Sequence, residues 1–370
     1  MGPFPHDAPA AVISADNPMG TDGFEFVEYA HPNPAELHAL FRLMGYVPVA
    51  RHKTKKITVY RQGDINYLVN EEPGTHGFNF VAAHGPCAPS MAFRVVDAKQ
   101  AHERALSLGA EPADVSSGQK TLDVPAIKGI GGSLLYFVDR YGAKGSAYDL
   151  EFEWFGVNNP RPAGAGLFYI DHLTHNVHRG RMGEWAAFYE RLFNFREIRY
   201  FDIEGKLTGL KSKAMTSPCG KIRIPINESA DERSQIQEYL DAYRGEGIQH
   251  IALGTDDIYH SVDQMTAHGV QFMDTPDTYY EQVEARLPGH GEELERLRRY
   301  RILIDGAPAP DDANGRLGIL LQIFTKTVIG PIFFEIIQRK GNQGFGEGNF
   351  QALFESIELD QVRRGVLQAK

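Results

Sequence analysis

The sequence predicts an α+β fold built from tandem βαβββ modules that form two domains. Residues 92–110 and residues 250–270 give the first indication, because each reads as a strand, an acidic helix start, a helix, a small turn and a second strand. Further copies of the pattern begin at residues 24–44 and residues 170–193. Self-similarity on this scale is typical of a duplicated structural unit. We therefore predict four modules, two in each half of the chain.

The order of the elements follows from hydrophobic patterning and from the residues at helix starts. Asp97 and Asp257 each stand directly before a predicted helix, where an acidic side chain suits the positive end of the helix dipole. The N-terminal half is predicted to contain strands at 24–29, 56–60, 92–97 and 133–137 and helices at 34–44 and 98–108. The C-terminal half is predicted to contain strands at 170–177, 221–226, 250–253, 320–324 and 333–337 and helices at 183–193 and 258–267.

The domain boundaries follow from length and local composition. A chain of 370 residues is long for a single core, so two domains are predicted. A stretch rich in Pro, Gly and Asn at residues 158–166 is the predicted linker. It separates an N-terminal domain at residues 24–157 from a C-terminal domain at residues 167–370, which is expected to end in a lid helix. Residues 1–23, rich in Pro, Ala, Gly and Asp, are predicted to be a flexible tail.

The composition narrows the class of protein. A net charge of -10 argues against a nucleic-acid partner, because a phosphate backbone attracts basic surfaces. An apolar fraction of 42% and a charged fraction of 23% fit a soluble protein, and no apolar run reaches the ~18 residues of a membrane span. Cys87 and Cys219 form no disulfide framework and fit a reducing compartment. A cytoplasmic protein without nucleic-acid or membrane partners is expected.

The most informative local feature is one carboxylate inside a run of large apolar residues. Glu335 lies in the segment at 331–339, which reads PIFFEIIQR and predicts a buried strand. Burying a carboxylate is costly unless it is paired, and a metal ion is a common reason to retain one. His172 and His250 lie in strand-like segments of the repeated modules. Two histidines and a carboxylate form the facial triad that holds ferrous iron with open positions.

Two alternatives remain open at this point. Each of the three residues alone also fits a structural role, since the chain contains 14 histidines and a strand carboxylate can be paired. The same ligand types also serve zinc-dependent hydrolysis. A cavity lined with phenylalanines favours oxygen activation at iron, because excluded water protects a reactive intermediate.

The surroundings of the predicted ligands follow from strand alternation. Asp171 stands beside His172 and could accept a hydrogen bond from it. Adjacent strand residues point to opposite faces, however, so Asp171 and Gln249 are expected to point away from the ligand histidines. His175 and His178 are expected to be carried away by the turn that follows them. Aligning the two halves assigns N-terminal counterparts to the ligands, and these are Ser90 for His250, Asp149 for Glu335 and Tyr29 for His172. The N-terminal half is therefore expected to bind no metal.

Several motifs occur in order along the C-terminal half. They are DHLTHNV at 171–177, IPINE at 224–228, SQIQ at 234–237, GIQH at 247–250, LLQIFTK at 320–326, FEIIQR at 334–339 and GFGEGNF at 344–350. With these motifs the chain resembles the 4-hydroxyphenylpyruvate dioxygenase family over most of residues 24–370. The family has the vicinal oxygen chelate fold. The resemblance thus implies two such domains, with an open half-barrel around the C-terminal metal site.

The resemblance implies an activity and partners. His172, His250 and Glu335 would bind Fe(II), and the 2-oxo acid of 4-hydroxyphenylpyruvate would chelate it. Reaction with dioxygen would yield homogentisate and carbon dioxide by decarboxylation, ring hydroxylation and side-chain migration, as in the catabolism of tyrosine and phenylalanine. Bacterial members of the family imply a homo-oligomer, either a tetramer or a dimer.

The resemblance also assigns the substrate pocket. Residues expected to orient the substrate are Ser212, Asn227, Gln235 and Gln322. Residues expected to form the aromatic walls are Phe324, Phe333, Phe345 and Phe350. Asn349 is expected to support the lid. A phenol entering an apolar pocket needs a few polar partners, and amides and a hydroxyl supply them.

Three rival functions share the predicted fold. Hydroxymandelate synthase uses the same substrate and metal but hydroxylates the benzylic carbon, and Asn227 and Phe350 favour ring attack instead. A non-catalytic small-molecule-binding protein would need no ligand triad. An extradiol ring-cleaving dioxygenase would need acid–base groups near the metal, for which His175 or His178 would have to serve.

Overall fold

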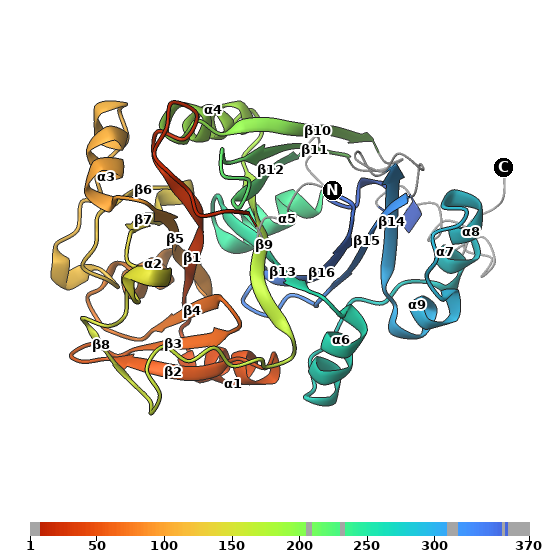
Figure 1. Cartoon of the computed structure of the whole chain (residues 1–370), viewed down its shortest axis with the longest axis horizontal. Helices are drawn as coiled ribbons and strands as arrows, with labels where there is room; N and C mark the ends of the chain where they lie inside the picture. Colours follow the sequence, from red (N-terminus) through yellow and green to blue (C-terminus); the bar gives the residue numbers. More distant parts are fainter. Residues whose placement is uncertain (1–7, 205–208, 230–233, 309–316, 350–351, 354–370) are drawn as a thin grey trace.

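The computed structural model describes residues 8–204, 209–229, 234–308, 317–349 and 352–353. Within these ranges the chain forms two 8-stranded sheets, one from each half of the sequence. Figure 1 shows the N-terminal sheet on the left, in red to yellow, and the C-terminal sheet on the right, in green to blue. The predicted α+β class with two sheet domains is confirmed.

The elements have the following bounds. The strands of the N-terminal half are β1 (Thr21–Ala30), β2 (Val47–His52), β3 (Ile57–Gln62), β4 (Ile65–Asn70), β5 (Cys87–Val95), β6 (Ala126–Lys128), β7 (Leu134–Val138) and β8 (Phe152–Trp154). Those of the C-terminal half are β9 (Leu167–Val177), β10 (Arg196–Glu204), β11 (Gly209–Thr216), β12 (Arg223–Ser229), β13 (Gly247–Thr255), β14 (Leu303–Pro308), β15 (Leu317–Phe324) and β16 (Phe333–Lys340). The α-helices are α1 (Pro34–Leu43), α2 (His76–His84), α3 (Ala98–Ser107), α4 (Met182–Phe193), α5 (Gln235–Tyr243), α6 (Ile258–Ala267), α7 (Asp277–Glu281), α8 (Val283–Arg286) and α9 (Leu294–Tyr300).

Each sheet contains two modules that meet at a central antiparallel pair. This pair is β1 with β5 in the N-terminal sheet and β9 with β13 in the C-terminal sheet. Each central strand also pairs in parallel with a later strand of its own module, in the pairs β1 with β4, β5 with β7, β9 with β12 and β13 with β16. The repeated pattern confirms the predicted modules. The second module of the N-terminal half departs from this pattern, because β8 pairs with β2 of the first module at the far edge of the sheet.

Two helices begin at the acidic residues that predicted them. The Asp97 carboxylate accepts a hydrogen bond from the backbone N–H of Gln100 at 2.9 Å, which starts α3. The Asp257 carboxylate accepts one from His260 at 3.1 Å, which starts α6. These N-caps satisfy backbone donors that a helix start otherwise leaves unpaired. The same cap therefore recurs at the same point of the module in both halves.

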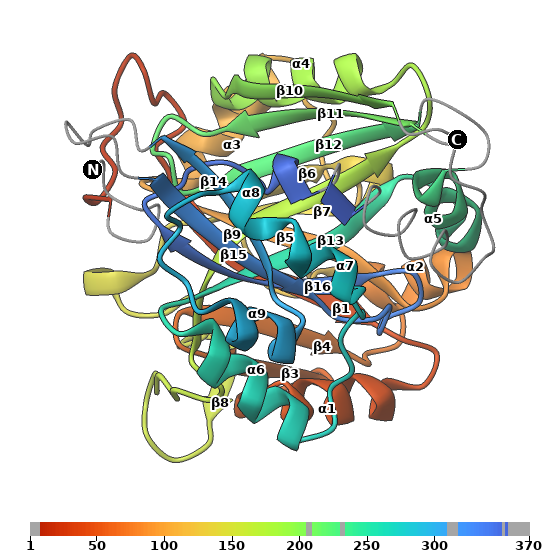
Figure 2. The same cartoon turned by 90° about the vertical axis from the view of Figure 1, so that its right-hand side faces the viewer.

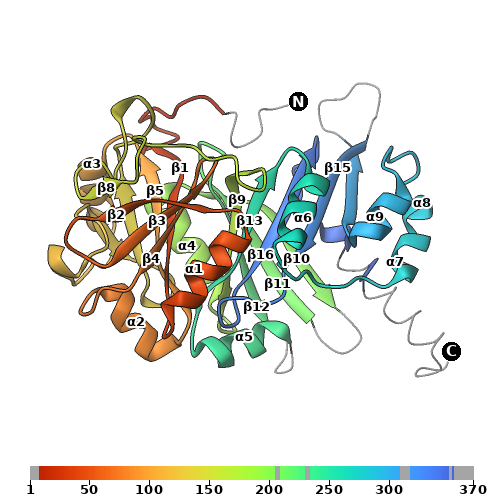
Figure 3. The same cartoon turned by 90° about the horizontal axis from the view of Figure 1, so that it is seen from below.

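The two sheets share one hydrophobic core. The Phe334 ring of β16 lies 6.3 Å from the Tyr29 ring and 5.8 Å from the Tyr67 ring, centroid to centroid. In the view from below, α1 and α6 lie at this junction (Figure 3), where Nδ1 of His268 is 3.2 Å from the Leu43 carbonyl oxygen. One face of the C-terminal sheet is thus buried against the N-terminal half, and its other face is left to form the site.

The inner faces of the two sheets differ. In the N-terminal sheet this face is filled by a cluster of buried apolar residues that includes Phe26, Tyr136 and Tyr148. In the C-terminal sheet the corresponding buried apolar cluster consists of Ala252, Leu320 and Ile337. Figure 2 faces this half and shows its strands curling around the side on which α7 and α8 lie. The inner face of the C-terminal sheet, which we call the cup, therefore leaves room for buried polar side chains such as His172, Gln322 and Glu335.

The first strand begins earlier than predicted. β1 starts at Thr21, within the range expected to be a flexible tail, and Met19 is fully buried. The Asn17 side chain binds the backbone of Thr21 in both directions, each hydrogen bond 3.0 Å long. Capping of the strand start thus extends the packed part of the chain back to Asn17. Among the described helices, none combines the length and apolar composition needed to cross a membrane.

Candidate metal centre

Three adjacent strands carry the predicted ligands on one face of the C-terminal sheet. His172 lies on β9, His250 on β13 and Glu335 on β16. The register places Ala252 of β13 between His172 and Glu335, each of which pairs with it. His250 precedes Ala252 by two residues and so shares its face. Because Ala252 is small, the side chains on either side of it converge above the sheet.

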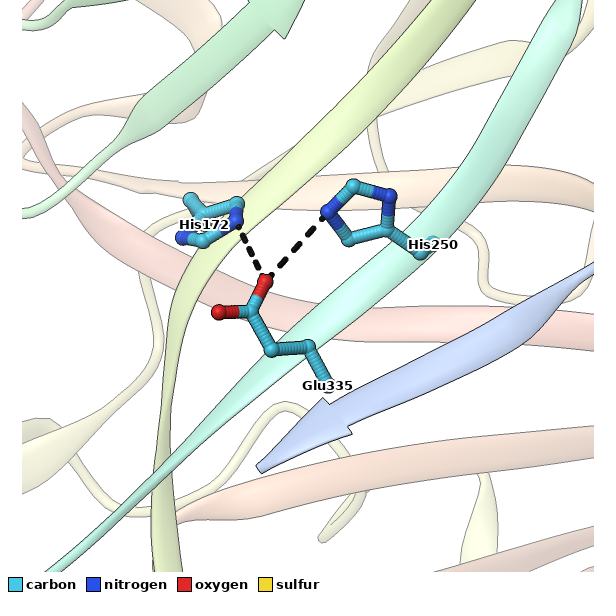
Figure 4. Close-up of side chains that lie close together, drawn as sticks. All are labelled: His172, His250 and Glu335. Atoms are coloured by element: carbon cyan, nitrogen blue, oxygen red, sulfur yellow. Dashed lines mark ion pairs between the residues drawn. The ribbon is translucent and has the colours of Figure 1, made fainter. Parts of the chain in front are cut away.

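The ligand atoms meet at one point. Nε2 of His172 lies 3.1 Å from a Glu335 carboxylate oxygen, and Nε2 of His250 lies 3.5 Å from the same oxygen. All three potential ligand atoms lie within 4.8 Å of one another. Figure 4 shows both imidazoles turned toward the carboxylate from neighbouring strands. The side chains of His172 and Glu335 are 3% and 2% exposed, so the cluster is cut off from bulk water except beside His250, at 13%.

A β-bulge orients His172. Ala252 pairs with His172, and the next residue, Leu253, pairs with Ile170, so Asp171 is an extra residue on β9. Because of the bulge, the Asp171 side chain lies on the same side of the strand as that of His172. Nδ1 of His172 lies 2.9 Å from an Asp171 carboxylate oxygen. The acceptor role considered for Asp171 is confirmed, whereas the expectation that it points away is wrong, because strand alternation does not hold across a bulge. With Nδ1 bound to Asp171, Nε2 is the nitrogen left for a metal.

A second bulge does the same for His250. Ile248 pairs with His175 and His250 pairs with Thr174, so Gln249 is the extra residue on β13. Its side-chain oxygen lies 3.0 Å from Nδ1 of His250. The expectation that Gln249 faces away is also wrong, for the same reason. The hydroxyl of Thr174 lies 3.0 Å from Nε2 of His250, the nitrogen that faces the cluster.

A buried arginine holds the acceptor of His172 in place. Arg339 of β16 donates two hydrogen bonds to the Asp171 carboxylate, at 2.6 and 2.8 Å. Burial alone would raise the pKa of Asp171, but Arg339 holds that pKa well below its ordinary value. Asp171 is therefore ionised, and its carboxylate accepts a hydrogen bond from Nδ1–H of His172. This hydrogen bond raises the basicity of the imidazole and so strengthens its bond to a metal ion.

The charges of the cluster attract a cation. Burial raises the pKa of Glu335, but His172 and His250 lower it more, to about 2. Burial lowers the pKa of His172, whereas Glu335 and Asp171 raise it to a net value above 6.5. Burial lowers the pKa of His250 below 6.5. The point where the three atoms meet therefore favours positive charge, which a proton on His172 or a divalent metal ion provides.

Aromatic rings form one wall of the centre, as expected. The Phe333 ring stacks on His250 with centroids 4.9 Å apart and planes at 19°. Phe324 lies edge-on to Phe333 at 6.1 Å. The Phe345 ring lies edge-on to the His172 ring with centroids 5.3 Å apart, and Phe345 is 8% exposed. Phe350, the fourth expected wall residue, and most of the expected lid helix lie outside the described residues.

Two predicted polar residues connect to Glu335. The Gln322 side-chain NH₂ donates to a Glu335 oxygen at 2.9 Å, and the Asn349 NH₂ donates to the Gln322 oxygen at 2.7 Å. Tyr279 of α7, which sequence reasoning missed, donates its hydroxyl to the Asn349 oxygen at 2.6 Å. All three of these polar residues are buried. Gln322 lies beside the metal cluster, where the resemblance implied it, whereas its role toward a substrate and the role of Asn349 in supporting the lid stay predictions.

The remaining predicted polar residues lie farther along the cup. Ser212 of β11 and Asn227 of β12 are direct cross-strand partners, so their side chains share a face of the sheet. Gln235 is exposed at the first residue of α5. The substrate-orienting roles of these three residues stay predictions.

His175 of β9, which was predicted not to bind the metal, faces away from the cluster. Nε2 of His175 lies 2.7 Å from the Tyr189 hydroxyl of α4, and burial lowers the pKa of His175 to about 3. The expectation was right in outcome, but strand alternation rather than the following turn removes His175 from the site. An acid–base role beside the metal, for which the extradiol alternative could use His175 or His178, does not fit this position of His175.

The register corrects the N-terminal counterparts of the ligands. They are Phe26 for His172, Ser90 for His250 and Tyr136 for Glu335. The prediction of Ser90 is confirmed, whereas Tyr29 and Asp149 are wrong, since register shifts in β1 and the position of Asp149 in a turn displace them. Phe26 and Tyr136 pack with centroids 5.6 Å apart. Aromatic packing thus occupies the position that holds the cluster in the C-terminal half.

The donor set fits a facial metal site. Two imidazole nitrogens and one carboxylate oxygen approach from the sheet, and the opposite side faces the cup. This is the ligand set of non-haem ferrous oxygenases, and it also suits a catalytic zinc ion. The fold and the site together define a protein of the glyoxalase and dioxygenase type with a candidate metal site.

Comparisons with known proteins agree with this class. The profile described as "Hydroxyphenylpyruvate dioxygenase, HPPD, N-terminal" matches residues 15–153, and that of the Glyoxalase/Bleomycin resistance protein/Dioxygenase superfamily matches residues 169–284. The 4-hydroxyphenylpyruvate dioxygenase of Pseudomonas aeruginosa is 59% identical, over 96% of this chain and 99% of that protein. Hemolysin VllY of Vibrio vulnificus is 60% identical over the same shares. A solved variant of 4-hydroxymandelate synthase from Streptomyces coelicolor is 26% identical, with a TM-score of 0.76 over 92% of this chain and 99% of that one.

These similarities extend over nearly the whole chain and include both halves. The chain belongs to the 4-hydroxyphenylpyruvate dioxygenase family.

Proposed function

We propose that the protein converts 4-hydroxyphenylpyruvate and dioxygen to homogentisate and carbon dioxide, with Fe(II) held by His172, His250 and Glu335. The single observation that supports the proposal most strongly is the convergence of these three donors within 4.8 Å of one another, with the His172 and Glu335 side chains buried. The 59% identity to a protein named for this activity supports the choice of substrate. A bound iron would supply chelation of the 2-oxo acid and activation of dioxygen.

The residues of the chain supply binding, orientation and exclusion of water. Phe324, Phe333 and Phe345 present apolar surface around the cluster, which suits the aromatic ring of the substrate. The Gln322 NH₂ fixes one oxygen of Glu335, so the other oxygen is directed to the histidines. Ser212 and Asn227 lie side by side and offer a hydroxyl and an amide to the phenol.

The substrate brings its own reductant. Its 2-oxo acid is oxidised to a carboxylate with loss of carbon dioxide, so the reaction needs no external 2-oxoglutarate. The phenol is hydroxylated at the carbon that bears the side chain, which then migrates to its neighbour. Fixing both ends of the substrate therefore matters, because the ring must be presented to the metal in one orientation.

Hydroxymandelate synthase activity is the second candidate, since the 26% identical relative shares the fold. It uses the same substrate but would oxidise the benzylic carbon. The resemblance to the dioxygenase family implies that Asn227 favours ring attack. The 59% identity to a dioxygenase makes homogentisate the preferred product.

The proposal also includes the setting of the enzyme. We place it in the catabolism of tyrosine and phenylalanine, in the cytoplasm, as a homo-oligomer of two or four copies. The two free cysteines and the net charge of -10 support a reducing compartment without a nucleic-acid partner. No membrane partner is proposed.

The test combines metal binding with product identity. Fe(II) and then 4-hydroxyphenylpyruvate are added without oxygen, and a visible charge-transfer band is expected when the 2-oxo acid chelates iron. Air is then admitted and the product is identified by mass and retention time. Homogentisate would support the proposal, and 4-hydroxymandelate as the main product would overturn it in favour of the synthase. Glu335→Ala is the control, in which the band and the product are both expected to be absent.

A further inference from the structure

Arg339 connects the metal cluster to a loop of the chain. Its guanidinium binds the Asp171 carboxylate through Nε and Nη2, at 2.6 and 2.8 Å. Its remaining nitrogen, Nη1, donates to the carbonyl oxygens of Asn342 and Gly344, at 3.0 and 2.7 Å. The side chain is 1% exposed. One rigid planar group therefore spans from the acceptor of His172 to the start of residues 342–349, which we call the metal-side loop.

The metal-side loop contacts one ligand, His172, directly and reaches a second, Glu335, through Gln322 of β15. Phe345 packs against the His172 ring at 5.3 Å and lies 6.0 Å from the Arg339 guanidinium. At the far end of the loop, Asn349 donates to Gln322, which in turn donates to Glu335. The loop is thus tied to His172 at one end and to Glu335 at the other.

We propose that Arg339 and Asp171 are positioning residues that couple metal binding to the arrangement of the metal-side loop seen in the structure, which we call closed. The inference rests on the metal-binding part of the proposed function and adds to it a device that links the cofactor to the wall of the substrate pocket. When His172 binds metal, its ring orientation is fixed, and the carboxylate and guanidinium behind it are fixed with it. The loop carbonyls that accept from Arg339 are then held as well.

Linkage makes this coupling reciprocal. If bound metal stabilises the closed loop, the closed loop raises the affinity for metal by the same factor. Loss of a group that orients a ligand from behind typically lowers metal affinity by about 10- to 100-fold. Loss of Arg339, which attaches the loop, is expected to lower metal affinity by a factor in the same range, because it frees the Asp171 carboxylate that orients His172.

The residue types suit this role. Only a guanidinium can bind a carboxylate with two parallel hydrogen bonds and still point a third donor at backbone carbonyls. A lysine keeps the charge but not this fork. Arg339→Lys therefore separates the geometric contribution from the charge, and Arg339→Gln removes both.

Arg94 in the N-terminal half provides a matched control. It is also largely buried, and it binds the carboxylates of Glu25 and Asp64, each at 2.6 Å. It lies on β5, in the half of the chain whose counterpart of the metal site is filled by Phe26 and Tyr136. Arg94→Gln thus removes a comparable buried ion pair without touching the metal-side loop.

The experiment measures Co(II) affinity and hydrogen exchange in the full-length protein. Co(II) is titrated into wild type, Arg339→Gln, Arg339→Lys, Asp171→Asn and Arg94→Gln, and peptides that cover residues 342–349 are followed by hydrogen–deuterium exchange with and without the metal. Circular dichroism and the thermal midpoint verify that each variant is folded. If Arg339→Gln does not fold, Arg339→Lys and Asp171→Asn carry the test.

Co(II) is expected to slow exchange of the metal-side loop in wild type and in Arg94→Gln. In the Arg339 and Asp171 variants, Co(II) affinity is expected to fall by about 10- to 100-fold, and the slowing by metal to be lost. A loop that responds to metal as in wild type, with affinity unchanged in the Arg339 variants, would overturn the coupling alone. Failure of wild type to bind Co(II) or Fe(II) would instead overturn the proposed function, and the coupling with it.

Discussion

The Gln249 side-chain oxygen lies 3.0 Å from Nδ1 of His250, its neighbour in the chain. Consecutive strand residues normally point apart, and the contact exists because Gln249 occupies a β-bulge on β13. Asp171 and His172 repeat the arrangement on β9. Both candidate metal-binding histidines thus receive their orientation from the residue directly before them.

The first prediction concerns this orienting contact. Gln249→Leu removes the acceptor for Nδ1 of His250, so the imidazole loses its fixed tautomer, and Fe(II) affinity is expected to fall by about 10- to 100-fold. Gln249→Glu retains an acceptor oxygen at the same position and serves as the control. Anaerobic Fe(II) titration against a competing chelator measures both. Equal affinity of Gln249→Leu and wild type would show that the bulge residue does not orient the ligand.

The second prediction concerns the ligands themselves. Glu335→Ala and His250→Ala are each expected to abolish oxygen uptake with 4-hydroxyphenylpyruvate, because two donors do not retain the metal in a catalytic geometry. The N-terminal half is expected to stay folded, since neither residue belongs to its core. Oxygen consumption and near-ultraviolet circular dichroism measure the two effects. Activity retained in either variant would remove that residue from the ligand set.

The third prediction concerns acid stability of metal-free protein. The pKa of Glu335 is lowered from 4.5 to about 2, so its contribution to stability is complete above pH 4.5 and is lost as the pH falls toward 2. The contribution is on the order of 3 kcal/mol. The free energy of unfolding of wild type relative to Glu335→Gln is therefore expected to decline across this window. Chemical denaturation at several pH values measures it, and a difference independent of pH would contradict the charge arrangement of the cluster.

The fourth prediction concerns a glycine of the metal-side loop. Gly346 has a φ of +80°, and a Cβ at this position would lie 1.7 Å from the Gln322 side-chain oxygen. Gly346→Ala is therefore expected to displace Gln322 from Asn349 and to lower kcat/KM by at least tenfold. Gly74 has a φ of +81° and open space around its Cβ position, so Gly74→Ala carries the same backbone strain without the clash. Similar activity in both variants would show that Gln322 is not held by the loop.

The fifth prediction concerns stoichiometry. Because Phe26, Ser90 and Tyr136 stand where the C-terminal half has its three donors, one metal ion per chain is expected. Metal analysis of protein loaded with Fe(II) without oxygen, and then desalted, measures the ratio. Two tightly held ions per chain, with the second retained after His172→Ala, would indicate a site in the other half.

The modules and the strands that carry the three candidate ligands were predictable, because both repeat local signals. The acidic caps Asp97 and Asp257 marked equivalent helices, and alternation along β16 put Glu335 on a defined face. The pairing of His172 and Glu335 across Ala252 agrees with that face. Local periodicity therefore predicted the three strands that hold the donors.

The residues behind the ligands were not predictable from periodicity. A bulge shifts the alternation by one residue, so Asp171 and Gln249 were assigned to the wrong face. One available signal was set aside in favour of strand alternation, namely that each ligand histidine directly follows a residue whose side chain can accept a hydrogen bond. Arg339 and Tyr279 approach from distant parts of the chain, and only the folded arrangement brings them to Asp171 and Asn349.

The central claim is that one iron ion is held by three side chains from β9, β13 and β16. A crystal structure of the protein loaded with Fe(II) without oxygen, with anomalous data collected at the iron edge, tests it most directly. We expect a single strong peak about 2.0–2.2 Å from Nε2 of His172, Nε2 of His250 and a carboxylate oxygen of Glu335. A peak bound by other residues, or no ordered iron in this cup, would contradict the account.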